Sequence, residues 1–325
     1  MPKLRLGVLG ASWWTDEVMA GFQAAANAEV TWIAARRPER AEEYAQRYGI
    51  ARCTSDYGDL LAARDVDAVF VGLPNYLHEE MAVAALASGK HVLQEKPMAL
   101  TADRAFAQAE IAARRGLKLM VDLELRLADS ICDLPEIIAT RLGGLRKLVL
   151  GVSLSSGVWE GWRGDPVRSG GTLLEMAIHQ IDLARWLFRK DPVSVWGQGL
   201  DVPGRDFTLV YDYGDGDSAI VEFCWRSAGF HAHICAYGAQ GVLRQDIEMP
   251  HGPAFRTLIT PDGTERGPVP ANVHGPETFR RVLEGFAEGV LFGADLPIPT
   301  ADGVWAVRIA QASRDSLHSC ARSAI

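Results

Sequence analysis

The chain has 325 residues, 48% of them hydrophobic, and a formal net charge of −8, which favours about two globular domains. Its acidic balance argues against a nucleic-acid partner, and no apolar run approaches the ~20 residues that would span a membrane. Five cysteines without C-x-x-C spacing, and an N-terminus without a signal-peptide pattern, predict a cytoplasmic protein with reduced thiols and no bound metal.

The first half of the chain alternates short apolar runs with helical patterns. Strands are expected over 4–9, 29–35, 50–54, 67–73, 91–93 and 117–121, and helices over 16–26, 39–48, 56–63, 78–88 and 101–115. Alternating strands and helices form right-handed βαβ units with a parallel sheet. We therefore expect an α/β domain over residues 1–122 with a doubly wound parallel sheet.

The turn after the first strand is where a dinucleotide-binding domain carries its G-x-G-x-x-G motif. The sequence there is GASWWT at residues 10–15, so only Gly10 survives. Ser12 stands where the backbone normally approaches a pyrophosphate, and Thr15 where glycine allows close helix packing. The following helix still offers free N–H groups and a positive dipole end, although Asp16 and Glu17 partly compete with an anion there.

Basic residues follow the second strand, where an NAD-type site has an acidic residue. The run Ala34-Ala35-Arg36-Arg37 contains no acid, and arginine at that place accommodates a 2′-phosphate. Arg36 and Arg37 therefore favour NADP(H) over NAD(H). The alternative is that both are solvated charges at the start of the next helix.

Two further stretches lie at the expected carboxyl edge of the sheet. Asn75, after the fourth strand, has the donor and acceptor groups that suit a carboxamide or ribose, and His78 is either a ligand contact or a helix residue with a satisfied ring. In Glu95-Lys96-Pro97 the proline ends the strand, because it lacks an N–H. This leaves Lys96 where ligands bind in open α/β sheets, or else in a surface ion pair with Glu95.

The second half has a different pattern. Strands are expected over 145–154, 193–198, 207–213, 218–225, 231–237 and 241–247, and helices over 278–292 and 301–318. Short connections with turn residues indicate a large, mainly antiparallel sheet. Residues 123–325 are therefore expected to form an α+β domain.

One expected helix, residues 173–188, carries a polar stripe on an otherwise apolar surface. It follows Gly170-Gly171, and Glu175, His179 and Asp182 are spaced i, i+4 and i+7, on one side of an α-helix. Either Asp182 pairs with Arg185 and the stripe faces water, or the stripe lines a cleft in which His179 exchanges a proton.

The ordered pair of motifs, Glu95-Lys96-Pro97 and then His179-x-x-Asp182 after Gly170-Gly171, resembles the Gfo/Idh/MocA oxidoreductases over essentially the whole chain. Pro74-Asn75-x-x-His78 and the loop Trp162-Arg163-Gly164-Asp165-Pro166 strengthen the likeness. The resemblance implies an N-terminal Rossmann domain, a C-terminal domain with an open sheet, and NAD(P)-dependent oxidation or reduction of sugars and polyols. It also implies a homodimer or homotetramer formed through the open sheet.

By this resemblance, Lys96 is the catalytic lysine, Glu95 helps to place it, His179 exchanges the proton, and Asp182 assists His179. The family usually has aspartate where this chain has Glu175, so we expect Glu175 to bind a substrate hydroxyl in a different pocket. The cleft between the domains is the expected place of reaction. The expected cofactor contacts are Gly10, Ser12, Trp13, Arg36, Arg37, Leu73, Pro74, Asn75, His78, Glu95, Lys96, Trp162 and Arg163.

Two interpretations of function remain from the sequence. The first is an NADP-dependent dehydrogenase or reductase, with NAD as the alternative cofactor. The second is a non-catalytic dinucleotide-binding sensor on the same fold, which the altered glycine positions at Ser12 and Thr15 suggest. Trp159, Trp162 and Arg163 either wall the substrate pocket, as indole faces pack well on sugars, or pack within their own loop.

Overall fold

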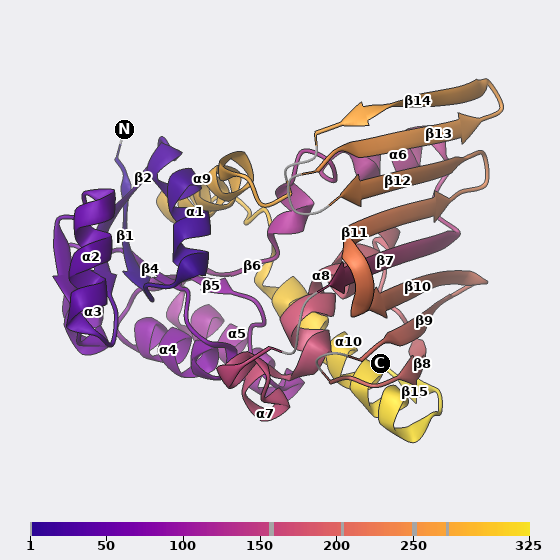
Figure 1. The fold of residues 1–325 in the computed structure, drawn as a ribbon. Coiled ribbons are helices and arrows are strands. Elements are labelled where there is room, and N and C mark those ends of the chain that lie inside the picture. The colour runs from indigo at the N-terminus through magenta and orange to yellow at the C-terminus, as the bar shows by residue number, and fades with distance from the viewer. Residues whose placement is uncertain (1, 156–158, 203–204, 249–251, 271–272) are drawn as a thin grey trace. The chain divides into compact units, whose positions relative to one another are not determined.

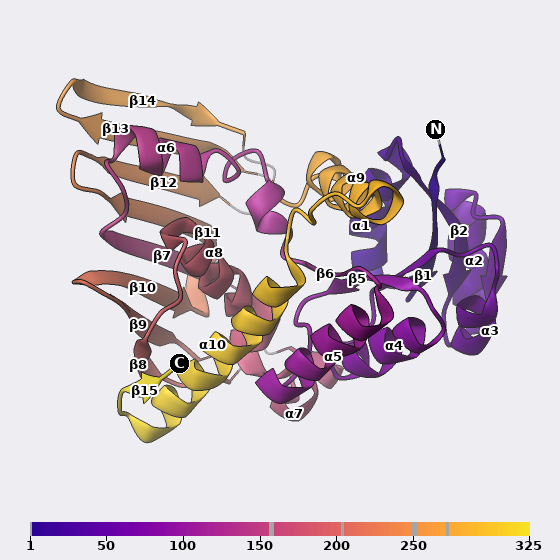
Figure 2. The same cartoon turned by 180° about the vertical axis from the view of Figure 1, so that it is seen from behind.

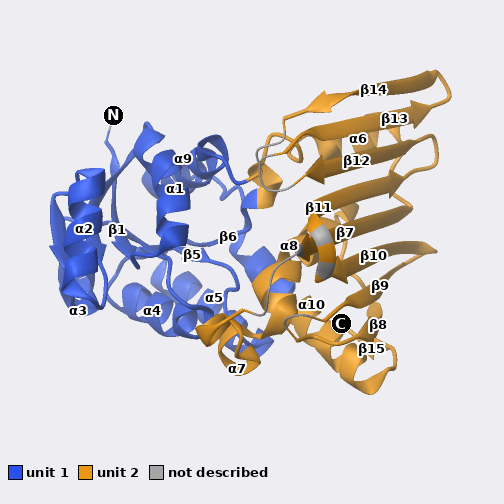
Figure 3. Ribbon diagram, in the orientation of Figure 1, with its two compact units in different colours: residues 1–124, 274–307 blue, residues 125–273, 308–325 orange. Residues whose placement is uncertain are grey.

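A computed structural model describes residues 2–155, 159–202, 205–248, 252–270 and 273–325. The chain forms two compact units, coloured separately in Figure 3. Unit 1 comprises residues 1–124 and 274–307, and unit 2 comprises residues 125–273 and 308–325. The expected boundary at residue 122 thus falls close to the end of the first segment of unit 1, but a later segment, 274–307, returns to that unit.

Unit 1 is built on a six-stranded sheet in the order β3-β2-β1-β4-β5-β6. All its neighbouring strands are parallel, as the βαβ alternation predicts. The strands are β1 Leu4–Leu9, β2 Ala28–Ala34, β3 Arg52–Thr54, β4 Ala68–Val71, β5 His91–Glu95 and β6 Leu119–Asp122. Strand order reverses between β1 and β4, and such a switch point is where doubly wound sheets bind ligands.

Helices cover both faces of this sheet. They are α1 Trp13–Ala24, α2 Pro38–Tyr48, α3 Tyr57–Ala62, α4 Asn75–Ala87, α5 Ala102–Arg115 and α9 Pro276–Phe292. Figures 1 and 2 show α1 and α9 side by side on one face, with α4 and α5 on the other. Gly21 permits the α1–α9 contact, because a Cβ there would lie 2.5 Å from Pro276 O. This packing explains why a helix late in the sequence belongs to the first unit.

Unit 2 contains a nine-stranded sheet in the order β14-β13-β12-β11-β7-β10-β9-β8-β15. Only β7 and β10 pair in parallel, so the sheet is mostly antiparallel, as predicted. Its strands are β7 Lys147–Ser155, β8 Ser194–Gly199, β9 Phe207–Gly214, β10 Asp217–Cys224, β11 Arg226–Tyr237, β12 Val242–Glu248, β13 Ala254–Thr260, β14 Gly263–Val269 and β15 Ser323–Ala324. The sequence pattern did not indicate β13 and β14, because β14 alternates little between buried and exposed side chains.

One face of this sheet is covered and the other is open. Side chains along β9, β10 and β12 alternate between buried and more exposed positions, as expected for an antiparallel sheet with one packed face. Helices α6 Leu134–Arg141 and α8 Ile178–Phe188 lie on the covered face (Figures 1 and 2). The remaining helices are the short α7 Pro166–Ser169 and the long α10 Thr300–Ser319.

The expected helix over 173–188 is not uniform. Leu173–Ala177 is a π-helical turn, and the α-helix begins only at Ile178. Two further short helical turns of the 3₁₀ type, Glu124–Leu127 and Gly161–Arg163, lie elsewhere in the chain. In the part of the chain that the structure describes, no helix combines the length and the hydropathy needed to cross a membrane.

Candidate active site

The turn after β1 is shaped by one glycine and one threonine. Gly10 has φ +117°, and a Cβ there would lie only 2.3 Å from Gly72 O, so the position admits glycine alone. The backbone N–H of Ser12 donates to Thr15 Oγ1 at 3.1 Å, and the Thr15 hydroxyl donates to Gly10 O at 3.2 Å. Thr15 is buried, and therefore ties the turn together where the usual motif has glycine.

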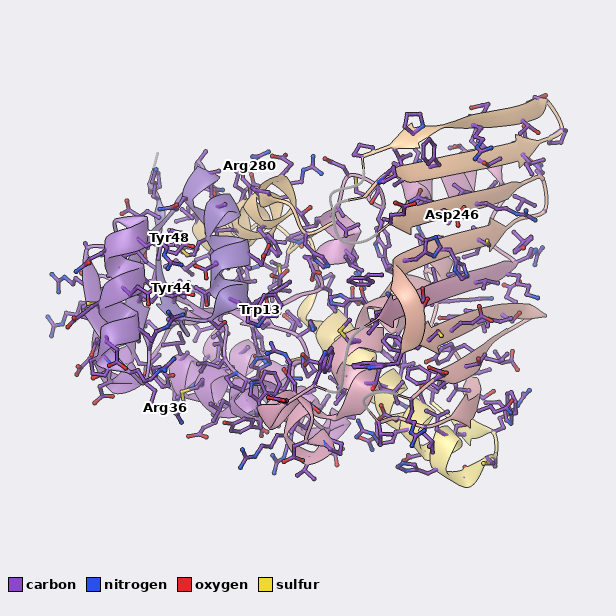
Figure 4. The ribbon with its side chains drawn as sticks, viewed as in Figure 1. Trp13, Arg36, Tyr44, Tyr48, Asp246 and Arg280 are labelled. Carbon is purple, nitrogen blue, oxygen red and sulfur yellow. The ribbon has the colours of Figure 1, made fainter. Side chains whose placement is uncertain are left out.

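The expected competition between Asp16 and a bound anion is reduced by side chains from α2. The Tyr44 hydroxyl lies 2.7 Å from Asp16 Oδ2, and Tyr48 donates to Asp16 Oδ1 at 2.6 Å (Figure 4). Arg47 adds an ion pair at 2.8 Å. Burial disfavours the Asp16 charge, but the bonds from Tyr48, Tyr44 and Arg47 outweigh it, and the pKa of Asp16 is lowered. Asp16 is thus an ionised anchor for α2.

Residues of this edge of unit 1 fit a dinucleotide. The N-terminal amides of α1 begin at Trp13, directly at the switch point between β1 and β4, and such amides bind phosphates. Arg36 and Arg37 follow β2, and both are exposed; Arg36 is labelled in Figure 4. Trp13 is also exposed, at 56%, so it is accessible to a ligand at this turn.

The next predicted stretch has a structural histidine. Helix α4 begins at Asn75, three residues earlier than expected, with Pro74 at its N-cap. His78 is 1% exposed, and its ring nitrogens lie 2.9 Å from Pro97 O and 2.6 Å from Leu73 O. His78 therefore links the turn after β4 to the turn after β5, which is the satisfied-ring alternative. Contact of His78 with the cofactor stays a prediction.

The Glu95-Lys96-Pro97 turn follows β5 at the carboxyl edge of the sheet. Glu95 is 5% exposed, whereas Lys96 is half-buried, and the Lys96–Pro97 peptide is cis. Gln94 and Gln108 hold the turn by donating to Met98 O at 2.6 and 2.8 Å. The simple surface ion pair is therefore excluded, because the glutamate of the turn is in the interior.

Trp14 reaches this turn from α1. Its indole N–H donates to Glu95 Oε1, and its ring makes an edge-to-face contact with Phe279 at 5.7 Å. Burial raises the pKa of Glu95 to about 8, although the positive charge of Lys96 acts in the opposite direction. The sequence showed Trp14 only as part of the turn after β1 and did not indicate this contact, because Trp14 and Glu95 lie 81 residues apart.

In unit 2, the glycine pair before the polar helix has a clear structural role. Gly171 has φ +76°, and a Cβ there would lie 2.6 Å from a carboxylate oxygen of Asp201. Asp201 accepts a hydrogen bond from Leu173 N at 2.8 Å and pairs with Arg314 at 2.9 Å. Arg314 also donates to Gly170 O. The buried Asp201 thus fixes the start of the segment that carries Glu175 and His179.

The members of the predicted stripe have different surroundings. Glu175 is 5% exposed and accepts from Arg163 Nε at 2.9 Å, and the Arg163 guanidinium lies 4.4 Å from the Trp162 ring centroid. His179 is half-buried. Arg163 therefore contacts Glu175, Trp162 packs against Arg163, and both loop residues remain expected ligand contacts.

Asp182 is buried, so it does not lie on the water-facing surface that was one of the alternatives. Its two oxygens accept from Arg126, with Nε at 2.7 Å, and both side chains are only 3% exposed. Arg185 pairs with Asp191, at 2.6 Å. Arg126 was not found from the sequence, because it lies 56 residues from Asp182; a lone arginine in an apolar segment was the only available signal.

The strand order of unit 1, β3-β2-β1-β4-β5-β6, is that of the Rossmann domains of dinucleotide-dependent oxidoreductases. In the described residues, no group of His, Cys, Asp or Glu is arranged to hold a metal ion. The chain matches two family models: an oxidoreductase family with an NAD-binding Rossmann fold over residues 4–123, and the GFO/IDH/MocA C-terminal domain over residues 138–244.

Known proteins are similar along nearly the whole chain. A 1,5-anhydro-D-fructose reductase of Ensifer adhaerens is 28% identical, with 93% of each chain covered. A dTDP-3,4-didehydro-2,6-dideoxy-alpha-D-glucose 3-reductase of Streptomyces violaceoruber is 30% identical, over 88% of this chain and 85% of that protein. A solved levoglucosan dehydrogenase, in complex with NADH and L-sorbose, matches with a TM-score of 0.90 at 20% identity, over 100% of this chain and 99% of that one. The protein belongs to the Gfo/Idh/MocA family of oxidoreductases, which supports an enzyme over a sensor.

Proposed function

We propose that the protein transfers a hydride between NADP(H) and a secondary alcohol or carbonyl of a sugar or polyol. The observation that carries this proposal is the position of Lys96, on a tightly held turn at the carboxyl edge of a Rossmann sheet. Family membership supports it, as do two relatives whose names specify carbohydrate reductases.

The chain's residues have separable roles in this reaction. The nicotinamide, when bound, supplies or accepts the hydride. Lys96 donates a hydrogen bond to the substrate oxygen and stabilises the negative charge that develops on it. His179 takes or returns the hydroxyl proton, a role worth about 10²- to 10⁴-fold in rate. Lys96 belongs to unit 1 and His179 to unit 2, and their joint action on one substrate stays a prediction from the sequence.

Asp182 is a positioning residue in this proposal rather than a proton carrier. Its carboxylate is engaged by Arg126 and buried, so it fixes the helix on which His179 lies. Glu175, held by Arg163, offers its carboxylate to a substrate hydroxyl. The contacts of Asp182 with Arg126 and of Glu175 with Arg163 favour a rigid position for the segment that carries His179.

The cofactor preference rests on the exposed Arg36 and Arg37 after β2, where an NAD-type site would have an acid. Their guanidinium groups suit a 2′-phosphate. NAD(H) is the alternative cofactor. Calorimetric affinities for NADP+ and NAD+ decide between them, and a preference for NAD+ would contradict this use of Arg36.

We further propose a cytoplasmic homodimer or homotetramer that associates through the open face of the nine-stranded sheet. Side chains of β9, β10 and β12 on that face remain half-exposed or exposed in the single chain. Light scattering coupled to size-exclusion chromatography measures the state directly. A monomer at micromolar concentration would contradict this part.

The experiment for the catalytic proposal is a screen of sugars and polyols with both nicotinamide cofactors, followed at the absorbance of the reduced ring. Lys96→Met should lower kcat/KM by about 10²- to 10³-fold, and Lys3→Ala, an exposed lysine of unit 1, is the control. Tight cofactor binding without turnover of any carbohydrate, and without an effect of Lys96→Met on any activity, would refute the proposal.

A further inference from the structure

Unit 1 buries three carboxyl groups next to Lys96. Glu95 ends β5, and Asp122, its register partner, ends the adjacent parallel strand β6. Glu124 follows two residues later, at the start of a 3₁₀ turn. Glu95 is 5% exposed, and Asp122 and Glu124 are 0% exposed. The cluster of Glu95, Asp122 and Glu124 therefore lies inside the protein at the carboxyl edge, where bulk solvent screens charges much less than at the surface.

Two of these groups have defined partners. The Trp14 indole N–H donates to Glu95 Oε1, and His274 Nδ1 lies 3.3 Å from Glu124 Oε1. The rings of Trp14 and His274 touch edge to face, with centroids 5.8 Å apart, so α1 and the segment before α9 close the cluster from one side. Asp122 differs, because neither of its carboxylate oxygens has a hydrogen-bond partner among the residues that the structure describes.

Three ionised carboxylates in this place are physically implausible. A buried, unpaired carboxylate normally takes up a proton rather than remain charged. The Lys96 ammonium and, when protonated, the His274 ring bring positive charge to the cluster, but neither donates a hydrogen bond to the Asp122 carboxylate among the described residues. Burial, followed by the charges of Glu95 and Glu124, raises the pKa of Asp122 well above its usual range.

We propose that Glu95, Asp122 and Glu124 share at least one proton at neutral pH, and that this proton sets the charge against which Lys96 acts, so that Asp122 is a positioning residue for the lysine. When the shared proton leaves at higher pH, the cluster gains a negative charge. That charge draws the Lys96 ammonium toward the cluster and weakens its hydrogen bond to the substrate oxygen. The rate should therefore fall as the cluster loses its proton.

The proton is detectable without any reaction. Infrared difference spectra of the full chain, without cofactor, should show the C=O stretch of a protonated carboxyl at pH 7 that disappears as the pH rises. Two variants should move this titration in opposite directions. Asp122→Asn removes a neighbouring negative charge and lowers the midpoint, whereas Trp14→Phe removes the donor to ionised Glu95 and raises it, each by about one pH unit. Opposite shifts distinguish electrostatics from loss of structure.

Asp103→Asn is the control variant, and Glu124→Gln is the second test of the cluster. Asp103→Asn removes one charge at an exposed position of the same unit and should leave the infrared titration unchanged. If Asp122→Asn does not fold, Glu124→Gln tests the same charge and should also lower the midpoint. No protonated-carboxyl band at pH 7 in the unmodified chain, or equal shifts in the Asp122→Asn and Asp103→Asn variants, would overturn the shared proton.

The kinetic half of the inference rests on the proposed function. The alkaline fall of kcat should move down by about one pH unit in Asp122→Asn and up in Trp14→Phe, with the KM for cofactor unchanged. An infrared titration that shifts while the kcat profile stays fixed would refute control of Lys96. Failure to find any carbohydrate substrate would instead remove the proposed function, and would leave the infrared result standing by itself.

Discussion

Replacing Asp182 tests whether its role is structural. The Arg126–Asp182 pair is almost fully buried, with both side chains 3% exposed. Removing one partner of a buried ion pair leaves an uncompensated charge and typically costs about 3–5 kcal/mol. We therefore expect Asp182→Ala to lower the free energy of unfolding by about 3–5 kcal/mol, a large part of the total stability of a typical domain.

A double variant tests whether the unpaired charge causes the loss of stability. Replacing both charges by apolar groups, Arg126→Met with Asp182→Leu, removes the unpaired charge, so it should be more stable than Asp182→Ala by at least about 2 kcal/mol. Glu265→Ala is the control: this acid pairs with Arg141 in the same unit, but the side chains are 67% and 40% exposed. Its loss should change stability by less than about 1 kcal/mol.

The assay is urea unfolding followed by circular dichroism, with kcat measured on the same samples. If Asp182→Ala unfolds too readily, Asp182→Asn keeps one acceptor and should give a smaller loss of the same sign. An Asp182→Ala variant as stable as the unmodified protein, with only kcat reduced, would refute the structural role and favour direct action on His179. A double variant no more stable than the single one would show that the buried charge is not the cause.

Other predictions concern unit 1. Gly10→Ala should weaken cofactor binding at least tenfold in calorimetry, because φ is +117° and the new Cβ would lie 2.3 Å from Gly72 O; unchanged affinity would contradict the fit of this turn to a dinucleotide. Thr15→Val removes the two bonds that tie the turn and should lower the free energy of unfolding by about 1–3 kcal/mol, measured by urea titration, whereas no loss would mean that water replaces them. Arg36→Glu should shift the ratio of affinities toward NAD+ by at least about tenfold, and an unchanged ratio would show that Arg36 is only a solvated charge. The pKa of Glu95 rises from 4.5 to about 8 on folding. Between these two pH values the folded chain therefore keeps a proton that the unfolded chain has lost. The contribution of this proton to stability is full below pH 4.5 and is lost as the pH rises to about 8. Urea titrations across that range should therefore show Glu95→Gln less sensitive to rising pH than the unmodified chain, and equal slopes would argue against a raised pKa.

The order of strands and helices in unit 1 could be predicted from the sequence because each is a local pattern. Continuous apolar runs such as Ala68–Val71 are buried on both faces of a parallel sheet, and residues such as Gly49, at φ +64°, end helices by a purely local conformation. The position of Lys96 just after the end of a strand could be predicted for the same reason, because Pro97 ends a strand through its own backbone chemistry.

In unit 2, the helical spacing of the sequence did not predict the local geometry correctly. A spacing of i, i+4 and i+7 assumes a uniform α-helix, but Leu173–Ala177 is π-helical, and its start is set by Asp201, which lies 28 residues beyond Leu173. Strands β13 and β14 were also missed from the sequence. Strand β14 is largely exposed at the sheet edge, so its side chains alternate little between buried and exposed positions.

The amino-acid sequence by itself determined most of the elements, the parallel and antiparallel sheets, the family resemblance and the lysine on its turn, since these follow from periodicity, proline and glycine chemistry, and motif order. Only the tertiary structure decided which charges meet. Trp14 reaches Glu95 across 81 residues, Arg126 reaches Asp182 across 56, and Glu95 becomes the register partner of Asp122. The physical reason is that burial and partner geometry control the ionisation of a carboxyl group, and both depend on segments that the fold brings together.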